Sequence, residues 1–136
     1  PMSLPQMKKT IDRARELDFL VFACADTLDE AKAIAQLHPD IINPEPSAII
    51  GGGNGVSPMA YVKDCIDAIK AIDPSILVEQ AAGITNGQQV YDFILAGSGA
   101  AGAASGIMNA KDPLAAIDEM IAATRRAADD LKKERK

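Results

Sequence analysis

Glu45 is a glutamate held between two prolines at the point where a short apolar run ends. Pro44 and Pro46 each fix a backbone angle, so together they limit the directions in which the carboxylate can point. A carboxylate at the end of a strand can act as a general base, because a substrate bound there lies within its reach. An ordinary surface glutamate in a loop fits the same residues, and these residues alone leave both interpretations open.

Two further turns carry small residues that suit an anion. The stretch Ala-Ala-Gly-Ile-Thr-Asn-Gly (81–87) follows one apolar run, and Ala104-Ser105-Gly106 follows the next. Small residues let backbone N–H groups approach an anion closely, and two such turns on neighbouring strands would converge on one phosphate. Each turn alone is more simply explained as ordinary turn chemistry. The pair, taken together with Glu45, favours a phosphate site.

The elements that must position these residues alternate between two hydrophobic periods. Helical spacing predicts helices over residues 4–17, from 26 or 27 to about 38, and over 58–74, 86–97 and 112–123. Apolar runs predict strands over residues 19–25, 41–45, 76–80 and 100–104. Thr27 and Glu30 have the spacing of a capping box, and Gly97 is the expected C-terminal cap of its helix. Residues 125–136 are charged on both sides and are expected to be a solvated helical extension or a frayed end.

A helix followed by four strand–helix units predicts an α/β fold with a parallel sheet and right-handed crossovers. The glycine-rich stretch within residues 46–57 cannot form a regular element, so it is predicted to be a loop. An open, doubly wound sheet and a part of a closed barrel both fit this order. Four strands are too few to close a barrel, which usually has eight strands and about 250 residues. Periodicity alone does not choose between the two.

Composition excludes several classes of function. Apolar residues make up 48% and charged residues 24%, as in ordinary soluble domains. The net charge is −5 and no basic stretch precedes the C-terminus, which argues against a nucleic-acid partner. No apolar run approaches the roughly 20 residues of a membrane helix, and no signal peptide is visible. We therefore expect a cytoplasmic protein with neither a nucleic-acid nor a membrane partner.

The cysteines and the single histidine predict no metal site. Cys24 and Cys65 match neither a metal-ligand spacing nor a redox motif, so both are predicted to be small buried hydrophobes. His38 precedes Pro39 at the end of a predicted helix, where a C-terminal cap is the expected role.

Residues 45–57 read Glu-Pro-Ser-Ala-Ile-Ile-Gly-Gly-Gly-Asn-Gly-Val-Ser. This stretch resembles the catalytic end of strand 6 and the mobile lid of archaeal-type triosephosphate isomerases, which read Glu-Pro-Pro-Glu-Leu-Ile-Gly-Thr-Gly there. Residues 81–85 resemble the Gly-Ala-Gly-Ile-Ser turn after strand 7 of that family. Residues 104–106 and 110–113 resemble the end of strand 8 and the turn into the last helix. The resemblance runs in register from about residue 11 to residue 122.

The resemblance implies that residues 1–136 are the C-terminal half of a single TIM (β/α)8 barrel domain, with strands 5–8 and their helices. It implies that Glu45 moves a proton between two carbons of a triose phosphate, in glycolysis and gluconeogenesis, without a cofactor or a metal. Pro46 would be the stiff hinge of the lid. The residues that the resemblance implies for binding the substrate phosphate are Gly51, Ala82, Gly83, Ser105 and Gly106.

The family's catalytic lysine follows strand 1 and its histidine follows strand 4, and neither strand lies in these residues. We therefore expect this chain alone to be inactive. We also expect it to pack against the missing N-terminal half or a second copy, as part of a homo-oligomer.

Several positions depart from the family pattern. Ala81 stands where the family has glycine, and Glu79 and Gln80 are polar where the family is usually apolar. These changes leave open a relative with another sugar-phosphate substrate, or a non-catalytic phosphate-binding protein that kept the fold. A barrel aldolase with a lysine Schiff base fits less well, because no lysine stands at a strand end and Lys111 opens a helix.

Overall fold

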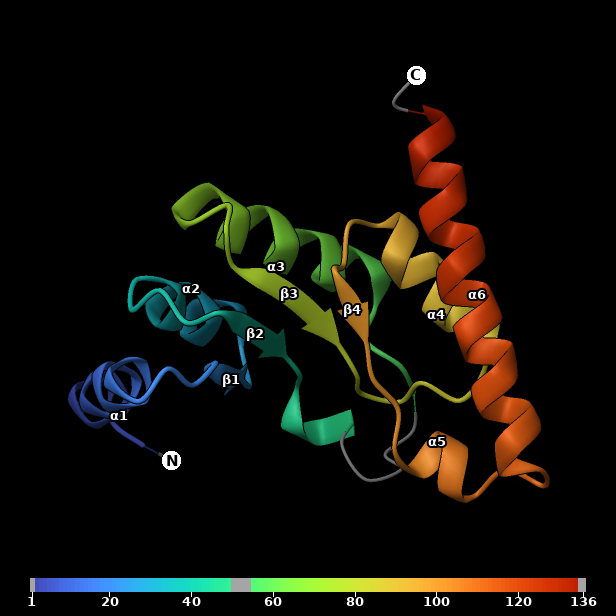
Figure 1. Ribbon diagram of the computed structural model, residues 1–136, viewed down its shortest axis with the longest axis horizontal. Helices are drawn as coiled ribbons and strands as arrows, with labels where there is room; N and C mark the ends of the chain where they lie inside the picture. Colours follow the sequence, from blue (N-terminus) through green and yellow to red (C-terminus); the bar gives the residue numbers. More distant parts are fainter. Residues whose placement is uncertain (1, 50–54, 135–136) are drawn as a thin grey trace.

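The computed structural model describes residues 2–49 and 55–134 and contains one parallel sheet with alternating helices (Figure 1). The strands are β1 (Phe22–Ala25), β2 (Ile41–Pro44), β3 (Leu77–Gln80) and β4 (Ala100–Ala101), and they lie side by side in chain order. The helices are α1 (Leu4–Glu16), α2 (Leu28–Ala35), η1 (Ser47–Ile49), α3 (Met59–Ile72), α4 (Gly87–Leu95), α5 (Ser105–Met108) and α6 (Pro113–Glu134). The predicted order of a helix and four βα units is confirmed.

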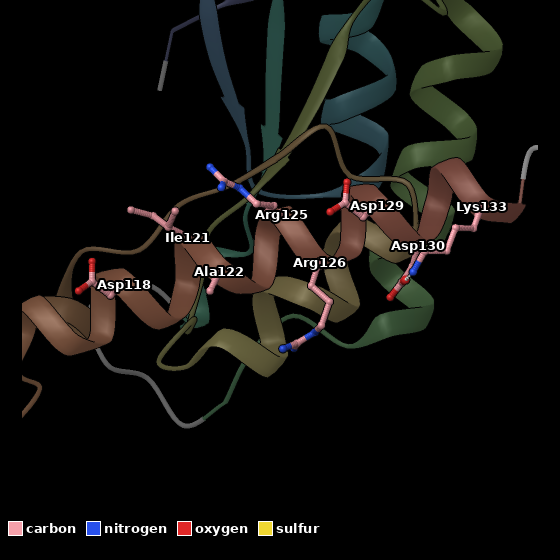
Figure 2. Close-up of a pocket in the computed structure, with 8 residues that line it drawn as sticks. All are labelled: Asp118, Ile121, Ala122, Arg125, Arg126, Asp129, Asp130 and Lys133. Carbon is pink, nitrogen blue, oxygen red and sulfur yellow. Dashed lines mark hydrogen bonds and ion pairs between the residues drawn. The ribbon is translucent and has the colours of Figure 1, made fainter.

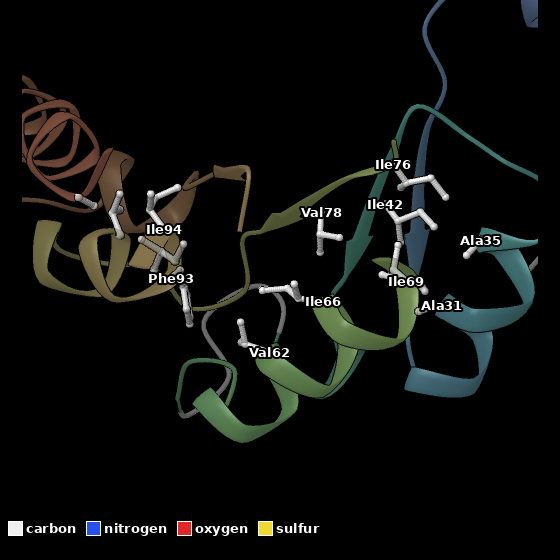
Figure 3. Close-up of a cluster of buried hydrophobic side chains, with 14 of the residues drawn as sticks. Ala31, Ala35, Ile42, Val62, Ile66, Ile69, Ile76, Val78, Phe93 and Ile94 are labelled. Atoms are coloured by element: carbon white, nitrogen blue, oxygen red, sulfur yellow. The ribbon is translucent and has the colours of Figure 1, made fainter. Parts of the chain in front are cut away.

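One face of the sheet is covered by helices. Helix α2 packs against β1 and β2, α3 packs against β3, and α4 packs against β4 and α6. Figure 3 shows the core between these layers, where Ile42 and Val78 point from the sheet toward Ile66 and Ile69 of α3. All four side chains are less than a tenth exposed. Burial of branched aliphatic side chains between a sheet and its helices is the main stabilising contribution in such a fold.

The other face of the sheet, which we call the inner face, carries the alternate residues of each strand. Phe22 and Cys24 of β1 lie on it and are exposed, and Asn43 of β2 and Glu79 of β3 lie on it and are buried. No helix that the structure describes covers Phe22, which is 53% exposed. Parallel sheets are normally covered on both faces. The inner face is therefore open at β1, as expected where the other strands of a closed barrel would lie.

Local signals in the sequence begin and end helices at the predicted positions. Thr27 caps α2, where its side chain accepts a hydrogen bond from the Glu30 N–H and completes the predicted capping box. Gly97 follows α4 with a φ of 106°, a conformation that favours glycine, as predicted for a cap. His38 follows α2 with a φ of 55°, and its N–H donates to the Ala35 carbonyl, as in a helix-end cap.

Four expectations need correction. The first strand begins at Phe22 instead of residue 19, and the last covers Ala100 and Ala101 instead of reaching residue 104. Residues 105–108 form the short helix α5, which the sequence did not predict. Cys24 is exposed, so its predicted burial was wrong, whereas Cys65 is buried as expected. The charged tail is the continuation of α6 up to Glu134.

None of the described helices is both long enough and apolar enough to cross a membrane.

Candidate functional site

Glu45 lies at the carboxyl end of β2 and is held by two hydrogen bonds. Its backbone N–H donates to the Ala25 carbonyl at 2.8 Å, which continues the β1–β2 ladder by one residue. The Asn43 side-chain amide donates to Glu45 Oε2 at 3.0 Å. The side chain is half-buried on the inner face, two residues beyond Asn43. A fixed carboxylate at a strand end is the arrangement that a general base requires.

Pro46 connects Glu45 to η1. Immediately after it, the Ser47 backbone N–H donates to Asp26 Oδ1 and the Ser47 hydroxyl donates to Asp26 Oδ2 at 3.1 Å. The chain is therefore attached to the end of β1 on both sides of Pro46. This attachment suits a stiff hinge at Pro46. Gly51, the residue expected to reach the phosphate from the lid, lies outside the described residues.

The turn after β3 contains Ala82 and Gly83 and packs against the end of the glycine-rich segment. Ala82 is 4% exposed, and Gly83 has a φ of 75°. A Cβ atom at Gly83 would lie 2.0 Å from the Gly55 carbonyl oxygen. Only glycine fits this close approach, so the turn and the Gly55–Val56 end of that segment are built to touch.

The turn after β4 packs against the turn after β3. A Cβ atom at Gly106 would lie 2.0 Å from the Ile84 carbonyl oxygen. Ser105 and Gly106 open α5 and, with Thr85, line an open hollow of about 340 Å³. The structure thus brings Ser105 and Gly106 to the β3 turn. Ala82 and Gly83 lie in that same turn but do not line the hollow.

A larger hollow of about 760 Å³ lies between α1, α2 and the ends of β1 and β2, and Glu45 lines this hollow and not the smaller one. Its polar wall includes Glu45, Asp26, Asp29 and Glu30, and its apolar wall includes Met7. Carboxylates repel a phosphate, so this hollow does not suit the phosphate end of a substrate. The turns after β3 and β4 bring no carboxylate into the smaller hollow, which makes it the better anion site.

A second carboxyl group, Glu79, lies on the inner face near Glu45. Its side chain is 8% exposed, and burial raises its pKa to about 7, with a further increase from the negative charge of Glu45. Partial burial, together with Glu45 and Glu79, also raises the pKa of the Cys24 thiol. From the sequence alone, Glu79 is only a departure from an apolar position of the family pattern. A charged residue in the interior of a predicted strand is the signal that could have marked it.

A hollow of about 480 Å³ along α6 has the character of a helix surface rather than a binding site. Figure 2 shows its side chains projecting from that one helix, far along the chain from Glu45. Three of its charged side chains already have local partners: Lys133 donates to Asp130 at 2.8 Å, Tyr91 donates to Asp130 at 3.0 Å, and Arg126 stacks over the Tyr91 ring. Within residues 2–49 and 55–134, no group of three or more His, Cys, Asp or Glu side chains has a metal-binding arrangement.

Four parallel strands with crossover helices, an inner face open at β1 and polar residues at the strand ends define half of a TIM barrel. In sequence, the half barrel is related to the triosephosphate isomerases of archaea. It is 31% identical over 122 residues to the enzyme of Methanothermus fervidus, and 32% identical over 122 residues to that of Methanocaldococcus jannaschii. The Sulfolobus acidocaldarius enzyme is 32% identical over 121 residues.

These matches cover 87–88% of this chain but only 52–56% of each relative, so the chain spans about half the length of these enzymes. No protein-family model matches the chain.

Solved structures support the fold alone. The Amycolatopsis orientalis BexX/CysO complex contains a chain that superposes with a TM-score of 0.64 at 18% identity, over 91% of this chain and 47% of that one. Nitroalkane oxidase from Streptomyces ansochromogenes superposes with a TM-score of 0.52 at 24% identity, over 69% of this chain and 29% of that one. Such distant matches carry no conclusion about chemistry.

Proposed function

We propose that this chain supplies the general base and the phosphate-binding turns of a triosephosphate isomerase, which interconverts dihydroxyacetone phosphate and glyceraldehyde 3-phosphate. The observation that carries the proposal is the placement of Glu45, fixed at the end of β2 by Asn43 and by the Ala25 carbonyl. Relatives at 30–32% identity are named for this activity, which supports the choice of reaction.

In this proposal Glu45 removes a carbon-bound proton of the triose phosphate and returns it to the neighbouring carbon. The substrate phosphate binds to backbone N–H groups at Ser105 and Gly106 in the smaller hollow and at Gly83 in the turn that packs against it, with Gly51 reaching it from the lid and Pro46 as the hinge. Ala82 supports the first of these turns from within the core. Closure of the lid excludes water from Glu45, which strengthens the electrostatic interactions inside the site.

The proposal requires an assembled barrel, by which we mean this chain together with a first half of four βα units, in one polypeptide or two. Stabilising the negative charge that develops on the substrate oxygen needs a donor or a cation. Neither a lysine nor a histidine stands beside Glu45 at the described strand ends. We therefore expect this chain alone to be inactive and the inner face to be covered by the first half. We also propose that the assembled barrel forms a homo-oligomer, as expected from the sequence.

The test is the rate of triose phosphate interconversion by the assembled barrel, wild type against Glu45→Gln. The amide cannot accept a proton, so kcat should fall by several orders of magnitude while binding of inorganic phosphate changes little. Equal rates would remove Glu45 from the mechanism.

A non-catalytic, sugar-phosphate-binding role is the alternative, and the observation that favours it is Ala81 in the turn after β3, which departs from the glycine of the family pattern that this turn resembles. Phosphate binding without any isomerase activity in the wild-type barrel would select this alternative.

A further inference from the structure

Glu79 is a buried acid for which the proposed mechanism has no role. It lies on β3 beside Ala100 of β4, and its Oε2 atom is buried without a hydrogen-bond partner. A Cβ atom at Gly102 would lie 2.4 Å from Glu79 Oε1, so the carboxyl group occupies the space above this glycine. The side chain therefore leans toward the carboxyl ends of the strands, where Glu45 lies.

Asn43 is the residue of β2 that lies next to Glu79 across the sheet. The register pairs Ile41 with Leu77 and Ile42 with Val78, so the next row brings Asn43 beside Glu79 on the same face. Asn43 is 4% exposed, and its Oδ1 atom is also buried without a partner. Its Nδ2 atom donates to Glu45, which fixes the orientation of the amide and turns Oδ1 away from Glu45.

The two unpartnered oxygens, Asn43 Oδ1 and Glu79 Oε2, are both acceptors when Glu79 is ionised. Buried acceptors without a donor are unfavourable, and two of them in neighbouring positions repel each other. A protonated carboxyl group supplies one O–H, which satisfies both oxygens at once.

We propose that Glu79 is a positioning residue for Glu45: its protonated carboxyl group donates its O–H to Asn43 Oδ1 and thereby holds the Asn43 amide against the Glu45 carboxylate. Only the catalytic consequence of this chain of hydrogen bonds rests on the proposed function. Burial and the charge of Glu45 raise the pKa of Glu79 to about 7, so the carboxyl group is protonated below neutral pH and about half protonated at it.

Of the titratable groups near Glu79, Glu45 is the one that raises its pKa. Glu45 lies at the end of β2, and the Cys24 thiol lies on β1, where the charge of Glu79 helps to raise its pKa. Strand β4 and Gly102, which follows it, contribute no titratable side chain. The helices α2, α3 and α4 lie on the opposite face of the sheet.

The first test uses the assembled barrel and two substitutions at Glu79. Glu79→Gln keeps an N–H that can donate to Asn43 Oδ1 and cannot ionise, whereas Glu79→Met has a similar length and no donor. The kcat of the wild type should fall as pH rises through about 7, and the kcat of Glu79→Gln should stay flat over that range. Glu79→Met should lower kcat by on the order of 10- to 100-fold at every pH, the loss expected for a displaced base, with KM within about twofold. A Glu79→Met variant with the same kcat and the same pH profile as the wild type would overturn the proposal.

The second test does not depend on activity. The side-chain amide ¹⁵N resonance of Asn43 should shift with pH in the wild-type barrel with a midpoint near 7. The shift should be absent in Glu79→Gln, and its midpoint should move to lower pH in Glu45→Gln, because the neighbouring negative charge is gone. An Asn43 resonance that does not shift between about pH 5 and pH 9 would overturn the positioning role of Glu79. A barrel without isomerase activity that still shows the expected titration refutes the proposed function and leaves the contact between Glu79 and Asn43 supported.

Discussion

Replacing Gly83 by alanine tests the contact between the turn after β3 and the glycine-rich segment. The added Cβ atom would lie 2.0 Å from the Gly55 carbonyl oxygen and 2.9 Å from the Val56 Cα atom. Both are backbone atoms, so the contact is relieved only by moving one segment away from the other. The backbone at Gly83 also has a φ of 75°, which is unfavourable for alanine whatever the available space.

Gly97→Ala is the matched control, because it introduces the unfavourable backbone conformation without the overlap. Gly97 has a φ of 106°, and its added Cβ atom would meet only Ile66 Cγ2, at an ordinary 3.6 Å. The left-handed conformation costs a non-glycine residue about 1–2 kcal/mol, and this cost is common to both variants. Forcing atoms into a filled space costs about 1–3 kcal/mol more, and only Gly83→Ala carries this second cost.

The measurement is urea unfolding of the assembled barrel. We expect Gly97→Ala to lower the free energy of unfolding by about 1–2 kcal/mol and Gly83→Ala to lower it by about 2–5 kcal/mol. Gly83→Ala should also weaken the binding of inorganic phosphate, whereas Gly97→Ala should leave it unchanged. Equal free energies of unfolding for the two variants would refute the contact with Gly55.

Three further predictions concern other parts of the chain. Thr27→Ala removes the acceptor for the Glu30 N–H, and it should lower the free energy of unfolding by about 0.5–2 kcal/mol, measured by urea denaturation; a change below experimental error would contradict the role of the cap. Cys24 is exposed on the inner face while Cys65 is buried, so a maleimide should modify Cys24 of this chain alone and not Cys24 of the assembled barrel, with Cys65 protected in both; labelling of Cys24 in the barrel would show that the inner face stays uncovered. Glu79 has a folded-state pKa of about 7 against an unfolded value of 4.5, so the folded state keeps the proton over a range in which the unfolded state has lost it. The free energy of unfolding should therefore fall by up to roughly 3 kcal/mol as pH rises from about 4.5 to 7, and Glu79→Gln should flatten this dependence; an unchanged slope in the variant would assign it to other groups.

The order of the elements could be predicted from the sequence because each helix carries its own apolar stripe and its own end signals. Thr27 and Glu30 begin α2, and Gly97 follows α4, at the expected positions. Helix α5 could not be predicted, and the fourth strand was predicted at the right place but too long. Helix α5 has four residues, which is barely one turn and too short for a hydrophobic period. Strand β4 has only two alanines, which show neither alternation nor strand propensity.

The burial of Cys24 was predicted wrongly for a different reason. A cysteine in an apolar strand is usually buried, but burial depends on what lies over that face of the sheet. Residue Cys24 alternates with Ala25, which is 4% exposed on the helix-covered side. Local sequence specifies this alternation but not whether the inner face has a cover.

The candidate site shows the same division between local and long-range information. Glu45 could be singled out because two adjacent prolines and a strand end are local features of the sequence. The relation of Glu79 to Asn43 depends on the register between β2 and β3, whose residues lie 36 positions apart along the chain. A shift of one residue in this register would turn one of the two side chains to the opposite face. Only the structure shows that Glu79 and Asn43 are neighbours on one face of the sheet.

Exchange of the substrate's carbon-bound proton tests the central claim most directly. The assembled barrel is incubated with dihydroxyacetone phosphate in deuterium oxide, and deuterium at the reacting carbon is followed by proton NMR. The wild type should incorporate deuterium during turnover, whereas Glu45→Gln should incorporate almost none and should still bind inorganic phosphate as the wild type does. Equal rates of incorporation in the two proteins would contradict the role of Glu45 as the base that removes this proton.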